Sequence, residues 1–174
     1  MNREAASNFD RMIEELRQEI AEREEALYSE VVLREAGAPK NMGRMDDADV
    51  HGVVHGWCGD TMEIYLRLED GSAQAPGSTQ SPGSTHSPMI AEATFVTDGC
   101  GATLACGSML TQMIMGMAVE KAEWVLPKDL INALGGLPEE HMHCASLAIS
   151  TLQNALFNWR MEQTEEDEGR RDAE

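Results

Sequence analysis

The sequence is poor in aromatic residues and in basic residues. Aromatic residues make up 5% of the 174 positions and hydrophobic residues 42%, so a core must rely on aliphatic side chains, alanine and the twelve methionines. Thirteen Lys and Arg stand against 31 Asp and Glu, which gives a formal net charge of −18. Phosphate backbones and anionic membranes repel such a chain, which argues against nucleic-acid binding and membrane-surface binding.

The chain also lacks long apolar runs and closely spaced cysteine pairs. No apolar run approaches the length of a membrane span, and residues 1–8 contain no apolar core of a secretory signal. We therefore expect a cytoplasmic protein in which the four cysteines stay reduced, which favours metal binding or catalysis over disulfides. The absence of a C-x-x-C pair excludes the zinc-ribbon and thioredoxin signatures.

Apolar periodicity predicts an amphipathic helix over residues 3–25, which we treat as an N-terminal extension. Its apolar residues follow one another at spacings of four, three, four and seven: Phe9, Ile13, Leu16, Ile20 and Leu27. We expect this helix to pack on its own domain. The alternative is a coiled-coil or partner-docking arm, which would allow a homo-oligomer. Residues 26–35 should continue as helix.

The middle of the chain has strand character, and the remainder is mostly helical. Residues 50–57 and 61–68 predict two strands joined as a hairpin, and residues 89–96 predict a third. Helices are expected over 104–115, 118–125 and 128–134 and from Pro138 onward, within a domain spanning 26–160. The Pro/Gly/Ser/Thr repeat within residues 70–88 predicts a disordered insertion, and residues 161–174 an acidic disordered tail.

Cys100 lies at the turn between the third strand and the following helix. Gly99 and Gly101 flank it and permit the backbone angles of a tight turn. A thiol at a helix N-terminus loses its proton more easily, and the thiolate is the form that binds metal or attacks sulfur. The alternative is a small, buried apolar residue, which is an equally common fate of a free cysteine.

Three cysteines share one placement, at the end of a predicted element. Cys58 occupies the hairpin turn with Asp60, Cys100 begins a helix, and Cys144 follows His143 in the first turns of the last helix. Three thiolates with an imidazole or a carboxylate form a sulfur-rich ligand set that suits Zn²⁺ or an iron–sulfur cluster. We expect three further residues to lie outside this set, with Cys106 in the core and His51 and His55 on the strand surface. His141 is likewise interpreted as a surface residue.

Six short motifs follow one another along the chain: Ala38-Pro39-Lys40-Asn41-Met42-Gly43, Cys58-Gly59-Asp60, Gly99-Cys100-Gly101, Ser108-Met109-Leu110, Gly136-Leu137-Pro138 and His143-Cys144. Taken together in this order, they resemble the iron–sulfur cluster assembly scaffolds of the IscU type and the N-terminal domain of NifU. The resemblance covers roughly residues 26–159.

This resemblance implies an α+β fold, in which a small three-stranded antiparallel sheet packs against helices. It implies a non-catalytic scaffold whose cluster ligands are Cys58, Cys100 and Cys144, with Asp60 and His143 as the other ligands. A cysteine desulfurase would deliver persulfide sulfur and an iron donor the iron. A transient two-iron, two-sulfur cluster would then pass to apo-proteins.

The chain departs from the family pattern in two ways. Where bacterial scaffolds carry Leu-Pro-Pro-Val-Lys for a dedicated chaperone, this chain has Leu137-Pro138-Glu139-Glu140-His141, so the resemblance gives little support for chaperone-assisted release. Residues 3–25 and the 70–88 insertion have no counterpart in the pattern. Two alternatives remain: a zinc-bound sulfur-transfer protein of SufU type, which the presence of His143 disfavours, and a Cys–His nucleophilic enzyme, for which no hydrolase signature is present.

Overall fold

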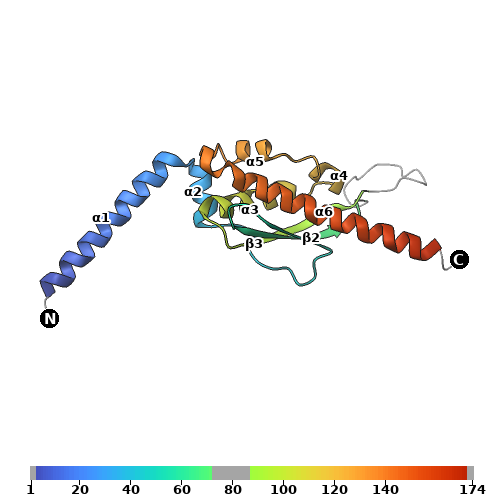
Figure 1. The fold of residues 1–174 in the computed structure, drawn as a ribbon, viewed down its shortest axis with the longest axis horizontal. Coiled ribbons are helices and arrows are strands. Elements are labelled where there is room, and N and C mark those ends of the chain that lie inside the picture. The colour runs from blue at the N-terminus through green and yellow to red at the C-terminus, as the bar shows by residue number, and fades with distance from the viewer. Residues whose placement is uncertain (1–2, 72–86, 172–174) are drawn as a thin grey trace.

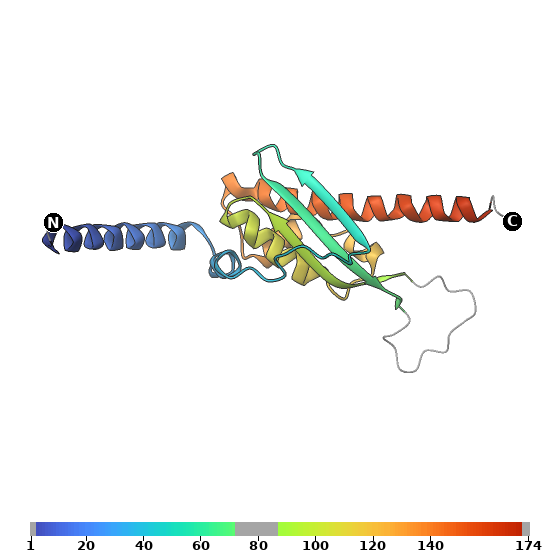
Figure 2. The same ribbon diagram turned by 90° about the horizontal axis from the view of Figure 1, so that it is seen from below.

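Three antiparallel strands form the sheet on which the fold is built. The computed structural model describes residues 3–71 and 87–171. The strands β1 (Val50–His55), β2 (Thr61–Glu69) and β3 (Met89–Thr97) follow one another in the sheet in chain order (Figures 1 and 2). Residues His55 and Thr61 pair at the end of the β1–β2 hairpin, so the predicted turn at Cys58 is confirmed.

Helices cover the buried face of this sheet and give the predicted α+β architecture. The helices after β3 are α3 (Gly101–Ile114), α4 (Val119–Ala122), α5 (Pro127–Ala133) and α6 (Met142–Arg171), the last preceded by the short 3-10 helix η2 (Glu139–His141). Their partners on the sheet include the fully buried Met62, Ile64 and Leu66 of β2. Leu68, the next residue in this alternation, is only half-buried because a β-bulge between Arg67 and Leu68 shifts the register.

The edge strand β1 lies directly against α6. An added Cβ on Gly52 would lie 2.4 Å from the backbone nitrogen of Ala155, so only glycine allows this approach. On either side of that contact, α6 side chains bond to the strand backbone. Val53 N–H donates to Asn154 Oδ1 at 3.1 Å, and Asn158 Nδ2 donates to the carbonyl of His51 at 3.2 Å. The sheet edge therefore fixes where α6, and the residues at its first turn, are placed.

The buried carboxylate Glu35 connects α2 (Glu30–Gly37) to α3. It accepts hydrogen bonds from Ser108 Oγ at 2.7 Å and Gln112 Nε2 at 2.9 Å, and Ser108 Oγ in turn accepts from Lys40 N–H. Burial opposes ionisation, but these hydrogen bonds outweigh it and lower the pKa of Glu35. The Lys40 segment and α2 are thereby anchored on the helix that begins at Cys100.

The helix α1 (Arg3–Leu27) corrects one prediction. It extends away from the sheet (Figures 1 and 2), and its apolar stripe, expected to pack on the domain, is exposed: 59% for Phe9, 48% for Leu16 and 56% for Ile20. The stripe is about one residue wide between charged positions, so packing it on the domain would bury little apolar area. The helix predicted over 26–35 is present but interrupted at residues 28–29, because Ser29 caps a new helix by accepting from Val32 N–H at 3.1 Å.

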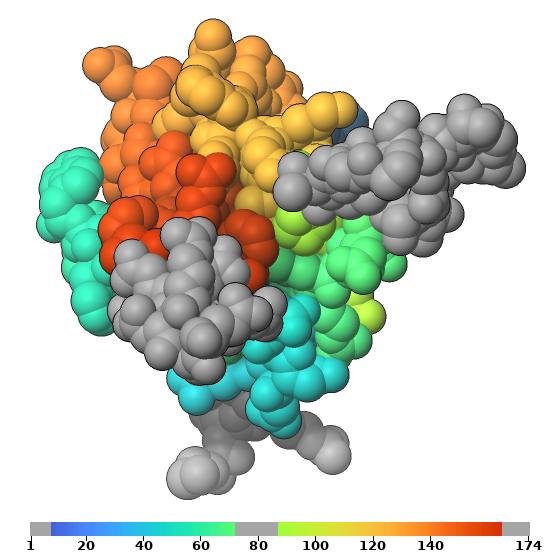
Figure 3. All heavy atoms as spheres, turned by 90° about the vertical axis from the view of Figure 1, so that its right-hand side faces the viewer, coloured from blue at the N-terminus to red at the C-terminus, as the bar shows by residue number. Residues whose placement is uncertain are grey.

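The two segments expected to be disordered have different outcomes. Most of the 70–88 insertion falls on residues 72–86, outside the described residues. The 161–174 tail is helical as far as Arg171, because its Glu-, Gln- and Arg-rich sequence has high helix propensity. In the space-filling view (Figure 3), α6 (red) emerges between the β1 region (teal) and the α4–α5 segment (gold). In the described part of the chain, no helix combines the length and apolarity needed to cross a membrane.

Candidate metal centre

Cys100 is placed by a tight turn at the start of α3. It is the N-cap residue of that helix, with extended backbone angles, and its side chain is exposed, so the alternative of a buried cysteine is wrong. The turn passes close to two polar side chains. A Cβ on Gly99 would lie 2.6 Å from Asp60 Oδ2 and 2.7 Å from Thr103 Cβ, which explains the glycine at that position.

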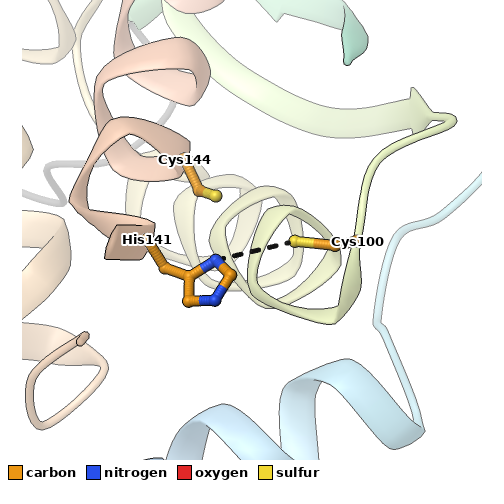
Figure 4. A group of neighbouring side chains, drawn as sticks. All are labelled: Cys100, His141 and Cys144. Carbon is orange, nitrogen blue, oxygen red and sulfur yellow. Dashed lines mark hydrogen bonds between the residues drawn. The ribbon is translucent and has the colours of Figure 1, made fainter. Parts of the chain in front are cut away.

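Two residues from the α6 end of the fold face this thiol. Cys144 lies in the first turn of α6 and is buried, and His141 ends η2 immediately before α6. The ligand atoms of Cys100, His141 and Cys144 all lie within 4.8 Å of one another. Figure 4 shows both sulfurs and the imidazole directed toward one shared space, with His141 Nδ1 4.0 Å from Cys100 Sγ.

The hydroxyl of Thr103 joins Asp60 to the two cysteines. Thr103 is fully buried in the first turn of α3, and its Oγ1 lies 2.9 Å from Asp60 Oδ2, 3.4 Å from Cys144 Sγ and 3.6 Å from Cys100 Sγ. The hydroxyl donates to Asp60 at the shortest of these distances. One buried side chain thus fixes the positions of three potential ligands relative to each other.

The two thiols of the centre differ in their readiness to ionise. Burial opposes ionisation of Cys100, but hydrogen bonds from Thr103 and from the Ala102 backbone outweigh it and lower the pKa of this thiol. Burial is the main cause that raises the pKa of Cys144 to about 11, and the charge of the nearby Cys100 raises it further. In the metal-free protein, Cys100 is therefore the more reactive thiol of the two.

This difference predicts the order of thiol alkylation in metal-free, folded protein. At about pH 8, roughly one Cys144 in a thousand would be thiolate, so iodoacetamide should modify Cys100 far faster than Cys144. Peptide mass spectrometry over a time course measures both rates. Cys106 serves as the internal control, since burial raises its pKa and removes it from solvent. Equal rates at Cys100 and Cys144 would contradict the prediction.

Cys58 and His143 lie on the neighbouring side of the centre. Cys58 is exposed on the hairpin turn, beside Gly59 with φ +96°, and it lines a cavity of about 190 Å³ together with Trp57 and His143. The ring of His143 packs on that of Trp57 at 5.0 Å, and its Nε2 lies 3.6 Å from Cys144 Sγ. Of the five predicted ligands, only Cys100 and Cys144 belong to the close group described above.

His141 is the residue that the sequence interpretation placed wrongly. Predicted to be a surface residue, it has a side chain only 25% exposed that faces Cys100. The signal was its spacing, because residues i and i+3 share one face of a helical turn, which aligns His141 with Cys144. The other two expectations are met: Cys106 is fully buried in the core, and His51 and His55 are exposed on β1.

Comparison with known proteins identifies the family. The family model described as the NifU-like N terminal domain matches residues 27–166. The chain belongs to this family. It is 34% identical over 134 residues to the iron-sulfur cluster assembly scaffold protein IscU 1 of Archaeoglobus fulgidus, which covers 76% of each chain. The nitrogen fixation protein NifU of Trichormus azollae is 31% identical over 153 residues, covering 82% of this chain and 46% of that protein.

Two solved structures share the fold. A NifU-like protein (N-terminal) from Brucella abortus superposes with a TM-score of 0.54 at 16% identity, covering 78% of this chain and 95% of that one. A putative scaffold protein for the SUF system from Fervidobacterium islandicum gives a TM-score of 0.54 at 17% identity, covering 74% and 96%. At these identities the likeness supports the three-stranded sheet and its helices.

The donor set of the centre suits soft and borderline cations. Two sulfur donors and one imidazole are the ligand types found with zinc and with iron–sulfur clusters, and Asp60 adds a hard oxygen donor nearby. The groups come from three separate parts of the chain, namely the β1–β2 turn, the start of α3 and the start of α6. The chain's residues therefore fit a metal or cluster with sulfur-rich coordination.

Proposed function

We propose that this protein is a scaffold on which an iron–sulfur cluster is assembled and from which the cluster passes to apo-proteins. The observation that carries this proposal is the gathering of Cys100, His141 and Cys144 around one space, in a chain that belongs to the NifU-like N-terminal domain family. The protein would act by holding and releasing its cargo and would not turn over a substrate.

We assign the cluster ligands to Cys58, Asp60, Cys100, His143 and Cys144, the last carried on the first turn of α6. Thr103 already positions Asp60 beside the two inner cysteines. Cys58 would join by movement of its exposed turn, where Gly59 provides backbone freedom. The carboxylate of Asp60 would hold the iron of a sulfide-bridged cluster less tightly than a thiolate, which favours release of a two-iron, two-sulfur cluster.

The partners follow from this function. A cysteine desulfurase would supply persulfide sulfur to an exposed thiol, an iron donor would supply iron, and apo iron–sulfur proteins would receive the cluster, all in the cytoplasm. The net charge of −18 favours partners that present basic surfaces. Glu139 and Glu140 stand where the bacterial chaperone motif is apolar, which disfavours chaperone-assisted release.

The exposed stripe of α1 supports a further proposal, that two copies associate through this helix. Its apolar positions alternate at spacings of four and three, as in a coiled-coil seam, with Ile13 and Ile20 separated by seven residues. Sedimentation equilibrium should give a mass above the 19.1 kDa of one chain. Replacement of Leu16 and Ile20 by Asp should lower the measured mass to that of a single chain. A single-chain mass for the unaltered protein at every concentration tested would contradict this.

Anaerobic reconstitution tests the scaffold function. Metal-free protein incubated with ferrous iron, cysteine, a desulfurase and dithiothreitol, which reduces the persulfide sulfur to sulfide, should develop sulfur-to-iron charge-transfer absorption, and adding an apo-ferredoxin should move the cluster to that acceptor. A colourless product would reject the function. The zinc-bound sulfur-transfer alternative predicts a different outcome, namely one equivalent of zinc in protein purified without air, no iron uptake, and persulfide on one cysteine.

A further inference from the structure

We propose that His141 is itself a metal ligand, and that Cys100, His141 and Cys144 form a preassembled site for a single divalent transition-metal cation. The family resemblance points to His143 as the histidine ligand, so this assignment adds His141 and shares only Cys100 and Cys144 with the cluster ligands. The inference rests on the proposed function only in treating that cation as the first iron of the cluster. Its geometry can be tested with a metal ion alone.

The distances between the three donors are close to those of a loaded site. Metal–sulfur bonds of about 2.3 Å and metal–nitrogen bonds of about 2.0 Å in a tetrahedron place the donor atoms roughly 3.5–3.8 Å apart. In this structure the donors all lie within 4.8 Å of one another, and His141 Nδ1 is 4.0 Å from Cys100 Sγ. Side-chain adjustments of about 1 Å therefore suffice to close the three donors on one ion.

The surroundings of His141 present Nδ1 to the cysteines. Its other ring nitrogen, Nε2, lies 3.9 Å from Glu140 Oε1, which is beyond hydrogen-bond distance. A shift of about 1 Å that brings this carboxylate onto Nε2 would favour the tautomer with the proton there, which leaves Nδ1 free to bind metal. The ring of Tyr28 packs against the imidazole with the ring centroids 5.7 Å apart and limits its rotation. Tyr28 is thus a positioning residue for the proposed ligand, and Glu140 would become one when metal binds.

A cation can reach this site from solvent. The side chain of His143 lines a second cavity, on the Cys58 side of the centre. Cys100, His141 and Tyr28 line a cavity of about 440 Å³ that is open to solvent. His143 also approaches Cys144, with its Nε2 3.6 Å from the Sγ, but it lines the smaller cavity with Cys58 and packs on Trp57. The first cation would therefore bind to Cys100, His141 and Cys144, and the His143 and Cys58 side would be engaged when the cluster is completed. Metal binding would release the thiol protons of both cysteines to solvent.

Cobalt(II) binding to the full-length, metal-free protein under anaerobic conditions tests the assignment. The unaltered protein should show thiolate-to-cobalt charge transfer and the ligand-field bands of a tetrahedral ion. Loss of a residue that only orients a ligand typically costs about 10–100-fold in metal affinity, so loss of a direct ligand in His141→Ala should cost at least about 100-fold. His143→Ala should cost less than about tenfold, and His51→Ala, on the exposed face of β1, should change nothing.

A second measurement requires no substitution. Long-range proton–nitrogen NMR of the zinc-loaded, unaltered protein should place the metal on Nδ1 of His141 and the proton on its Nε2. The inference is overturned if His141→Ala binds cobalt within about threefold of the unaltered protein, or if both ring nitrogens of His141 remain metal-free in the zinc-loaded protein.

The two proposals fail separately in these experiments. Cobalt binding that depends on His141, in a protein that never assembles a cluster, would reject the scaffold function and keep the cation site. Normal cluster assembly together with cobalt binding that ignores His141 would reject the cation site and keep the function. Far-UV circular dichroism on each variant verifies that the fold persists.

Discussion

Cys100→Ala should assemble no stable cluster under conditions in which the unaltered protein does. This thiol has a lowered pKa, lies at the exposed N-terminus of α3, and faces both His141 and Cys144, so its loss removes the donor most ready to bind iron or accept sulfur. We expect the charge-transfer absorption and the amounts of bound iron and sulfide to fall by about tenfold or more. Loss of a residue that only hydrogen-bonds to a metal ligand typically costs at least about tenfold in metal affinity, and loss of a direct ligand should cost more.

Cys106→Ala is the matched control for this experiment. Cys106 is on the same helix, six residues further on, but it is fully buried in the core and away from the ligand group. Its replacement removes one buried sulfur, at a stability cost of about 1 kcal/mol, and should leave cluster assembly intact. Cys100→Ser tests whether the thiolate itself is needed, since serine keeps nearly the size of the side chain but has no thiol. A Cys100→Ala protein that assembles as much cluster as the Cys106→Ala protein would contradict the assignment.

Gly52→Ala is expected to have the largest effect on stability. The added methyl group would lie 2.4 Å from the backbone nitrogen of Ala155 and 2.6 Å from its Cα, and backbone atoms cannot rotate away as a flexible side chain can. To relieve the overlap, α6 must move off β1, which also weakens the bonds of Asn154 and Asn158 to that strand. We expect a loss of about 3 kcal/mol or more in the free energy of unfolding, measured by urea denaturation followed by circular dichroism.

Gly37→Ala provides the contrast for Gly52→Ala. Gly37 is the last residue of α2, and a Cβ built there meets nothing within 4 Å. Because alanine favours helix over glycine, this variant should be as stable as the unaltered protein or more stable by up to about 1 kcal/mol. Equal stabilities for the two variants would mean that α6 does not approach β1 as closely as described.

The fold was largely predictable because its signals are local. Alternation in Thr61–Leu68 identifies β2, and the glycines around Cys100 mark the turn that begins α3. The bulge at Arg67 could not be foreseen, because it depends on how β2 pairs with β3. The helix break at Ser29 has a recognisable capping residue, but the bond from Ser29 to the Leu134 carbonyl joins segments far apart in the sequence.

The candidate site was predictable in part. Cysteines at the ends of elements are visible in the sequence, and two of them do meet, while the third lies on a neighbouring exposed turn. Thr103 was missed because its significance depends on distances between elements, whereas His141 was missed although its spacing of three residues from Cys144 is visible in the sequence. Thr103 in a helix usually bonds only to its own backbone, and nothing in the sequence indicates that its hydroxyl reaches Asp60 across the turn.

Both edge strands of the small sheet, β1 and β3, form backbone hydrogen bonds with other parts of the chain. Asn154 and Asn158 engage the outer side of β1, while Phe95 of β3 exchanges backbone bonds with Asn41 and Gly43. The backbone of Ile90, nearer the other end of β3, is bonded to Gly116 and Met117. A client or donor protein therefore finds few open main-chain groups along which to extend the sheet by a further strand. Under the proposed function, recognition would depend on side chains around the turn and helix ends, which would leave the sheet undisturbed during cluster transfer.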